Sequence, residues 1–344
     1  MTQISAFLLN IGGQMRPGLA GIWQVLAGIS WPVFLQRAIV QGVPLLYGST
    51  GEILTEKAGH LNLGIPGIMC MGGAGGCLVL NMIGGSSLPP FLIVILGILG
   101  SLAFSVLGGL IYSFLTVTFR ANQNVTGLTL TTFGVGLSKV IMTKLDTVVY
   151  LVRTRDYFRW PFAGRQDSLQ LWGVLFFLAI IVAIASSWVL FRTKTGLHLR
   201  AVGENPATAD AVGINVTRYK YAATCIGSGI AGLGGFYYII DYMASQEAYL
   251  SVEAWGWLSI ALVIFALWRP HMTIIGSTVF GILFSLGSFI TNSSWIKVTM
   301  ATIPLLKMLP YVVTILVLIV SSIRNKRENQ PPASLGLSYF REER

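Results

Sequence analysis

Charged side chains are scarce in this sequence of 344 residues, because Asp, Glu, Lys and Arg together make up only 10% of it. Cysteine and histidine are rarer still, with three of each. Cys70, Cys77 and Cys225 all fall within apolar runs and have no CxxC spacing, so we interpret them as small packing residues and not as disulfide partners or metal ligands. With 54% hydrophobic residues and so few charges, the composition is not that of a soluble globular domain.

Signatures of catalysis are also missing. The sequence has no GxxxxGK[ST] phosphate-binding loop and no HExxH zinc motif. No nucleophile stands out with a base beside it. We therefore expect no catalytic residue, no metal ligand and no bound cofactor on this chain.

Long apolar runs are what the sequence has in abundance, and its mean hydropathy is +0.71. A membrane-spanning helix needs roughly 20 mostly apolar residues, so the chain can hold about eight to ten spans. We predict an all-α polytopic membrane protein in a lipid bilayer, with some spans broken or partial. The pI near 9.7 does not indicate nucleic acid as a partner, because Lys and Arg collect in the loops beside the spans, as they do on the cytoplasmic side of membranes.

Three regions follow from this pattern. Residues 1–30 are expected to form an interfacial helix or a marginal span, and the residues do not separate these two possibilities. Residues 31–323 are expected to form the transmembrane domain, with a cytoplasmic loop at 192–220. Residues 324–344, with Pro331 and Pro332, are expected to form a flexible cytoplasmic tail.

The loop at 192–220 is a polar island between two apolar runs. Asn205 can cap a helix whose first residue is Pro206, and Gly213 stands where a helix can end in a left-handed residue. This predicts a short helix of about two turns. Ala207 and Ala211 lie four residues apart on one face, so that another surface can approach closely. A solvated loop helix without a partner is the alternative.

The stretch TGLHLRAVGENPATADAVGI resembles the cytoplasmic coupling segment of the permease subunits of ABC importers. The branch in question carries simple sugars, nucleosides and branched-chain amino acids. The resemblance implies that the short helix docks into a separate ABC ATPase subunit, which would hold ATP and Mg. The residues that match this coupling segment are Arg200, Gly203, Glu204, Asn205, Pro206, Ala209 and Gly213.

Further blocks extend the resemblance, in the family order, to about 36–318. STGEILTEKAGHLNLGIPGIMCMGG is similar to a family block in which Pro66 replaces the usual glutamate. ANQNVTGLTLTTFGVGLS, WGWLSIALVIFALWRP and LPYVVTILVLIV resemble three more. Glu52, Glu56 and Lys57 are interpreted as a loop after a first span that ends near Tyr47. Gly72, Gly76, Gly227 and Gly235 are expected at close helix contacts.

A path for a neutral polar solute should present hydrogen-bonding groups and aromatic faces. Helix capping and bonds between helices are the competing uses of the same side chains. The candidates for this substrate pathway are Asn62, Asn124, Thr126, Thr132, Trp257 and Ser259.

Four arginines, Arg153, Arg155, Arg159 and Arg165, lie among aromatic residues in a segment expected on the outer side of the membrane. This segment is either a docking surface for an extracytoplasmic solute-binding protein or a lid that packs on the outer face.

The resemblance implies a multi-pass permease in the bacterial inner membrane that pairs with a second, homologous permease, as a heterodimer. It is nearest to nucleoside permeases, with a simple sugar or a flavin-like nucleoside derivative as alternative solutes. The alternatives from other functional classes are a secondary transporter and an intramembrane enzyme. Neither a buried carboxylate or histidine pair nor a matched inverted repeat stands out to support them.

Overall fold

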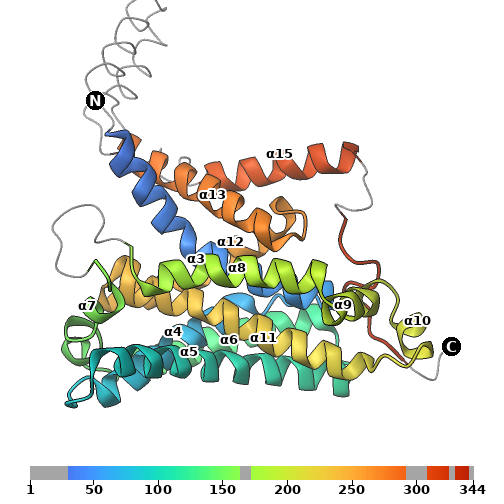
Figure 1. Cartoon of the computed structure of the whole chain (residues 1–344), viewed down its shortest axis with the longest axis horizontal. Helices are drawn as coiled ribbons and strands as arrows, with labels where there is room; N and C mark the ends of the chain where they lie inside the picture. The colour runs from blue at the N-terminus through green and yellow to red at the C-terminus, as the bar shows by residue number, and fades with distance from the viewer. Residues whose placement is uncertain (1–29, 163–171, 292–307, 325–329, 341–344) are drawn as a thin grey trace, which may run out of the picture.

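The computed structural model describes residues 30–162, 172–291, 308–324 and 330–340. Every regular element in these ranges is helical, so the predicted all-α class is confirmed. The segment 1–30 lies outside the described residues, apart from Ser30. The helices α8 and α11 run lengthwise along the molecule, α3 crosses them obliquely, and the C-terminus lies at the same end as α9 and α10 (Figure 1).

The helices of the described part follow one another with short connections. They are α3 (Trp31–Lys57), α4 (Ile65–Ile83), α5 (Pro90–Ser113) with η1 (Phe114–Thr118), α6 (Gln123–Met142), η2 (Val148–Val152), α7 (Arg155–Phe158), α8 (Val174–Arg192), α9 (Lys194–Glu204), α10 (Pro206–Ala211), α11 (Val216–Tyr237) with η4 (Tyr238–Met243), η5 (Gln246–Ser251), α12 (Val252–Phe265), α13 (Pro270–Thr291) and α15 (Leu309–Arg324).

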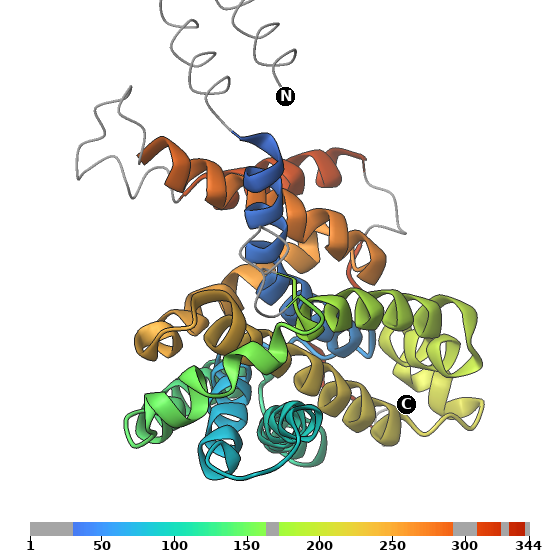
Figure 2. The ribbon, with the colours of Figure 1, turned by 60° about the vertical axis from the view of Figure 1, so that its left-hand side comes forward.

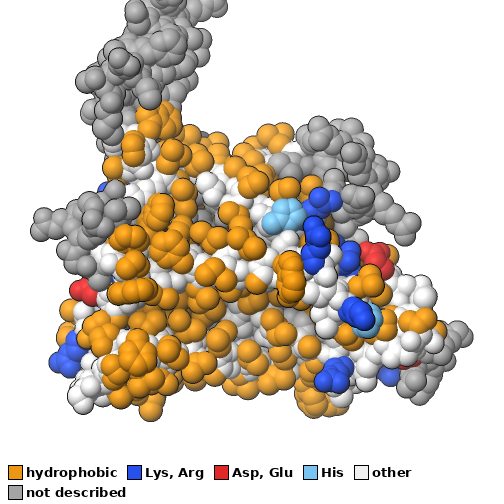
Figure 3. All heavy atoms as spheres, viewed as in Figure 1, with side chains coloured by type: hydrophobic (Ala, Val, Ile, Leu, Met, Phe, Trp, Pro, Cys, Tyr) orange, Lys and Arg blue, Asp and Glu red, His pale blue; other side chains and the backbone are white. Residues whose placement is uncertain are grey.

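Six of the described helices are long and apolar enough to cross a membrane, and α13 adds a shorter apolar helix. Hydrophobic side chains cover the broad middle of the molecule, while Lys and Arg side chains gather mainly at the end that carries α9 and α10 (Figure 3). This distribution is the one expected of a protein that crosses a bilayer with its basic loops in the cytoplasm. The chain is a polytopic membrane protein.

Two helices form the centre of the bundle. In the α11 span 83% of the residues in the apolar window are buried, and in α4 78% are, whereas in α8 only 33% are. Glycines allow this close packing: a Cβ atom on Gly235 would lie 2.0 Å from the carbonyl oxygen of Met69, and one on Gly227 would lie 2.4 Å from that of Gly51. Gly72 and Gly76 are equally tight against α5 and α11. The prediction that these glycines lie at helix contacts is confirmed.

The long helix α3 joins the two parts of the molecule. It passes from the group that contains α13 into the group that contains α4, α5 and α11 (Figure 2). The interpretation of Glu52, Glu56 and Lys57 as a loop was wrong, because α3 continues to Lys57 and all three side chains are buried. Burial is tolerated here because distant residues supply hydrogen bonds to the two carboxylates.

The C-terminal segment, residues 330–340, also differs from the expected flexible tail. The amide of Ser334 donates to the carbonyl of Gly203 at 3.1 Å, and the amide of Gly336 donates to that of Gly59 at 3.3 Å. The side-chain amide of Gln123 donates to the carbonyl of Leu337 at 3.3 Å. This segment is therefore held against α9, α6 and the loop between α3 and α4.

Candidate functional site

The basic end of the molecule, which is the end expected in the cytoplasm, is built on two short helices, α9 and α10 (Figure 3). The Asn205 side chain accepts a hydrogen bond from the Thr208 amide at 3.0 Å and so caps α10, which begins at Pro206. At the other end Gly213 has a φ of 85°, and the Ile214 amide donates to the Ala209 carbonyl. The predicted cap, first residue and left-handed end of this helix are confirmed.

The inner face of these helices packs on the rest of the chain. Ala209 is 3% exposed and forms a small apolar cluster with Val202 and Val216. A Cβ atom on Gly203 would lie 2.2 Å from the carbonyl oxygen of Lys57, at the end of α3. Ala209 and Gly203 were predicted as coupling residues, and the structure places them where they support α9 and α10 from within instead of facing a partner.

The outer face of α10 is small and uncovered. Ala207, Thr208 and Ala211 are exposed, and the Val212 side chain beyond the helix is 71% exposed. Glu204 and Asn205 are exposed at the start of the same helix, while the Arg200 guanidinium lies over the Phe191 ring at 5.1 Å. A surface of this kind lets another protein approach the helix backbone closely.

The structure distributes the six predicted pathway residues over buried and exposed positions, and three of them are buried. Ser259 is 0% exposed and donates to the Trp255 carbonyl at 2.8 Å. Asn62 is also buried: its side chain accepts from the Gly64 amide at 3.0 Å, just before α4. Thr126 is buried on the inner face of α6. These three side chains cap or pack helices within this chain, and their place on a solute path stays a prediction.

Asn124 and Thr132 lie on the opposite, exposed face of α6, and Trp257 is half-buried on α12. With Leu128 and Gly136, the two polar residues form a stripe in steps of four residues along α6 that no other part of the described chain covers. The Thr132 hydroxyl donates back to the Leu128 carbonyl at 3.2 Å. This bond lowers the free-energy cost of placing the hydroxyl in an apolar environment.

A buried polar group near the cytoplasmic ends of α3 and α4 was missed from the sequence. The Asn62 amide donates to Glu52 Oε1 at 3.1 Å. The indole Nε1 of Trp268 donates to Glu56 Oε2. In the sequence Asn62 lies 10 residues from Glu52, and Trp268 lies 212 residues from Glu56. No local spacing therefore revealed the bond between Trp268 and Glu56.

On the outer side, the arginine segment is in part a lid. The Nε atom of Arg159 lies 3.5 Å from Asp241 Oδ1, and both side chains are buried. Arg159 Nη2 also donates to the Asp241 carbonyl at 3.3 Å, while Phe158 packs edge-on against Phe236. Arg165 lies outside the described residues. Asp241, a carboxylate at the outer end of the α11–η4 span, was not predicted from the sequence.

An apolar bundle with a basic cytoplasmic end and a small capped helix exposed there is the architecture of a membrane transport subunit. Residues 34–319 match the family described as branched-chain amino acid transport system / permease component, and the chain belongs to that family. It is a permease subunit of an ATP-driven ABC importer, a transport subunit and not an enzyme, and a multi-pass protein of the cell inner membrane. Permeases of this family work with an ATPase and a solute-binding protein.

Three relatives cover most of the chain. TsgC13 of Haloferax volcanii, provisionally named a glucose ABC transporter permease, is 31% identical over 264 residues, which are 74% of this chain and 77% of the relative. The nucleoside ABC transporter permease NupC of Lactococcus lactis is 30% identical over 299 residues, 83% of this chain and 91% of the relative. The guanosine ABC transporter permease NupQ of Bacillus subtilis is 28% identical over 303 residues, again 83% and 91%.

Proposed function

We propose that this chain carries a nucleoside, or a related small polar solute, across the membrane as part of an ABC importer. The two relatives with nucleoside names align with more of the chain than the relative with a glucose name does. The exposed stripe on α6 fits a neutral solute, because it offers one amide and one hydroxyl without a charge. A simple sugar is the second candidate, supported by the likeness to TsgC13. The comparisons do not favour a flavin-like solute.

The solute path runs along Asn124 and Thr132 of α6, and half-buried Trp257 of α12 is a further candidate for its lining. Both helices pack on α4. In this arrangement the second wall of the path is the homologous permease. Asn124, Thr132 and Gly136 in this stripe support this, since polar and small residues on a membrane helix face a partner or water more readily than lipid.

The α10 helix couples this subunit to the ATPase, which holds the ATP and Mg. Its outer face is the feature that carries this proposal: Ala207 and Ala211 are exposed and small, and the helix is capped at both ends, so that it can be displaced as a unit. Since Gly203 abuts the end of α3, a push on α9 and α10 would reach the membrane helices directly.

The test is uptake by proteoliposomes that contain this permease with its second permease, ATPase and solute-binding protein. Radiolabelled guanosine should accumulate with ATP, and glucose should not compete. Ala211→Trp projects into solvent in the isolated chain, so it should leave the permease folded but reduce uptake and stimulated ATP hydrolysis at least about tenfold by blocking docking. Met82→Trp is the matched control, because Met82 is 75% exposed and lies at the C-terminal end of α4, far from α10.

Two results would contradict these proposals separately. If glucose accumulates and guanosine does not, the solute is a sugar and not a nucleoside. Full uptake by the Ala211→Trp protein would show that the outer face of α10 does not dock on the ATPase.

A further inference from the structure

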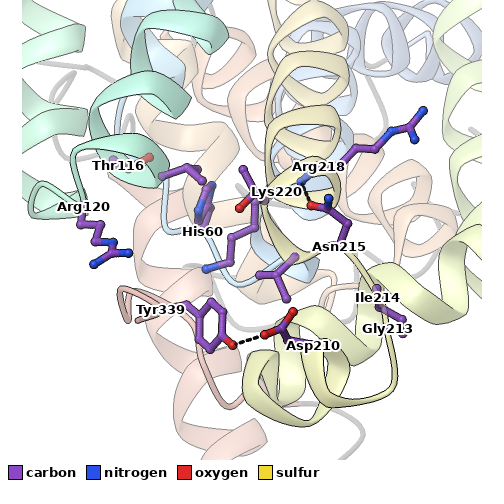
Figure 4. A pocket seen from close by; sticks show the side chains of 13 residues that line it. His60, Thr116, Arg120, Asp210, Gly213, Ile214, Asn215, Arg218, Lys220 and Tyr339 are labelled. Carbon is purple, nitrogen blue, oxygen red and sulfur yellow. Dashed lines mark hydrogen bonds between the residues drawn. The ribbon is translucent and has the colours of Figure 1, made fainter. Parts of the chain in front are cut away.

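A cavity of about 590 Å³ opens at the cytoplasmic end of the molecule. Its walls come from the loop between α3 and α4, from η1 and Arg120 just beyond it, from α10 and its link to α11, from the first turns of α11, and from the C-terminal segment (Figure 4). The residues used below are His60, Arg120, Asn215, Arg218, Lys220 and Tyr339, all of which line it. This volume lies within the range of roughly 300–1,000 Å³ that is usual for small-molecule sites.

Lys220 is the most informative residue of the cavity. It is only 3% exposed, yet its side chain reaches from α11 into the cavity between His60 and Tyr339 (Figure 4). No described carboxylate forms an ion pair with it. A buried ammonium group without a counter-charge is costly unless an anion joins it.

The other charges around the cavity are mostly positive as well. Arg120 and Arg218 line it, and Arg120 holds a left-handed backbone conformation, with a φ of 56°, while its guanidinium lies 4.8 Å from the centre of the Phe340 ring. The one acidic lining residue, Asp210, accepts a hydrogen bond from the Tyr339 hydroxyl at 2.9 Å. Lys220 and Arg120 therefore outnumber the single acidic lining residue, while the Arg218 guanidinium points away from the cavity centre (Figure 4).

His60 does not offset this charge. Its Nδ1 lies 3.1 Å from the Thr224 hydroxyl. Burial, and then the nearby Lys220 ammonium, lower the pKa of His60 well below its usual value. His60 is therefore neutral at physiological pH and contributes a ring wall to the cavity.

The first turn of α11 adds backbone donors. The Asn215 side chain accepts from the Arg218 amide at 2.9 Å, whereas the amides of Val216 and Thr217 belong to the same turn and have no partner within the helix. This is a helix of 22 residues, and the partial positive charge at its N-terminus favours an anion.

We propose that this cavity binds a phosphomonoester, with the phosphate held by Lys220, Arg120 and the first turn of α11. A phosphate group offers several acceptor oxygens, which suit an ammonium, a guanidinium and backbone amides together. The remaining volume takes the organic part of the ester beside the rings of His60 and Tyr339. Either a soluble metabolite or the headgroup of phosphatidic acid supplies this chemistry.

A bound phosphate would join α11 to η1 and, through Asp210 and Tyr339, to α10 and the C-terminal segment. It would thereby stiffen the cytoplasmic end of the permease. This consequence rests on the coupling role proposed for α10, whereas binding itself does not.

The test measures binding to the purified permease complex in two arms. In detergent, adenosine monophosphate is titrated and followed by ³¹P NMR and by thermal shift, with adenosine as the uncharged comparison. In nanodiscs of phosphatidylcholine, phosphatidic acid is added in steps and followed by thermal shift. Lys220→Gln removes the charge and keeps most of the side chain; Lys194→Gln is the control, because Lys194 is exposed at the same end of the molecule outside the cavity.

Saturable binding of either phosphate, weakened at least about tenfold by Lys220→Gln and unchanged by Lys194→Gln, supports the proposal and identifies the source. Arg120→Gln should weaken binding in the same arm. Binding that is absent in both arms, or equal in the wild type and Lys220→Gln, overturns it. Binding to the permease alone that disappears in the complete complex also overturns it, because the cavity is then filled by an acidic group of the ATPase.

Discussion

The buried pair of Arg159 and Asp241 gives a sharp test of how the outer lid is held. Asp241→Asn keeps the size of the side chain and removes its charge, so that the Arg159 guanidinium stays buried without a counter-charge. Breaking a buried pair on one side costs about 3–5 kcal/mol. We expect a value near the lower end, because Arg159 Nη2 keeps its hydrogen bond to the Asp241 backbone carbonyl.

The assay is the free energy of unfolding in mixed micelles, titrated with sodium dodecyl sulfate and read from tryptophan fluorescence. The double variant Arg159→Met with Asp241→Asn should recover most of the loss, since neither charge is then buried. Asp156→Asn is the matched control: it makes the same chemical change on exposed α7 and should leave the stability unchanged. The reasoning is refuted if Asp241→Asn costs nothing, or if the double variant is as unstable as the less stable single variant.

Two further predictions concern the path and the packing. Thr132→Val removes a hydroxyl from the exposed stripe of α6 without changing its size, so uptake of guanosine should fall about 2- to 10-fold while complex assembly is kept; unchanged uptake would move the path away from this face. Gly235→Ala forces a Cβ against the Met69 carbonyl and should lower the free energy of unfolding by about 1–3 kcal/mol in the same micelle assay. Gly136→Ala is the control: its Cβ would meet nothing within 4 Å, so it should not lower the free energy of unfolding. Equal stability of the two alanine variants would contradict the close approach of α4 and α11.

The local structure of the coupling region followed from the sequence because its determinants are local. A cap residue, a proline at the first position and a glycine past the end act within ten residues of one another, as Asn205, Pro206 and Gly213 do. The helix-contact glycines were predictable for a similar reason, since a small residue every fourth position marks one face.

The errors came from interactions between distant residues. Glu52 and Glu56 have the composition of a loop, and only partners supplied by the folded bundle make them acceptable inside α3. Asp241 pairs with a residue 82 positions away. The C-terminal segment is held by backbone amides bonded to Gly203 and Gly59 and by side chains such as Gln123 and Tyr339, whose partners are far away in the sequence and leave no local pattern to read.

These same long-range contacts indicate how motion at α10 can reach the bilayer. The backbone of Gly203 abuts the last residue of α3, and Ser334 holds that glycine from the other side. Within α3, Glu52 bonds to the start of α4 and Glu56 to Trp268, which lies between α12 and α13. Leaving any of these buried polar groups unpaired costs about 1–3 kcal/mol, so the ends of the helices prefer to move together. A displacement of α10 by the ATPase, as proposed, would then shift the cytoplasmic ends of α3, α4 and α12 as one unit and would open the uncovered face of α6 from that side.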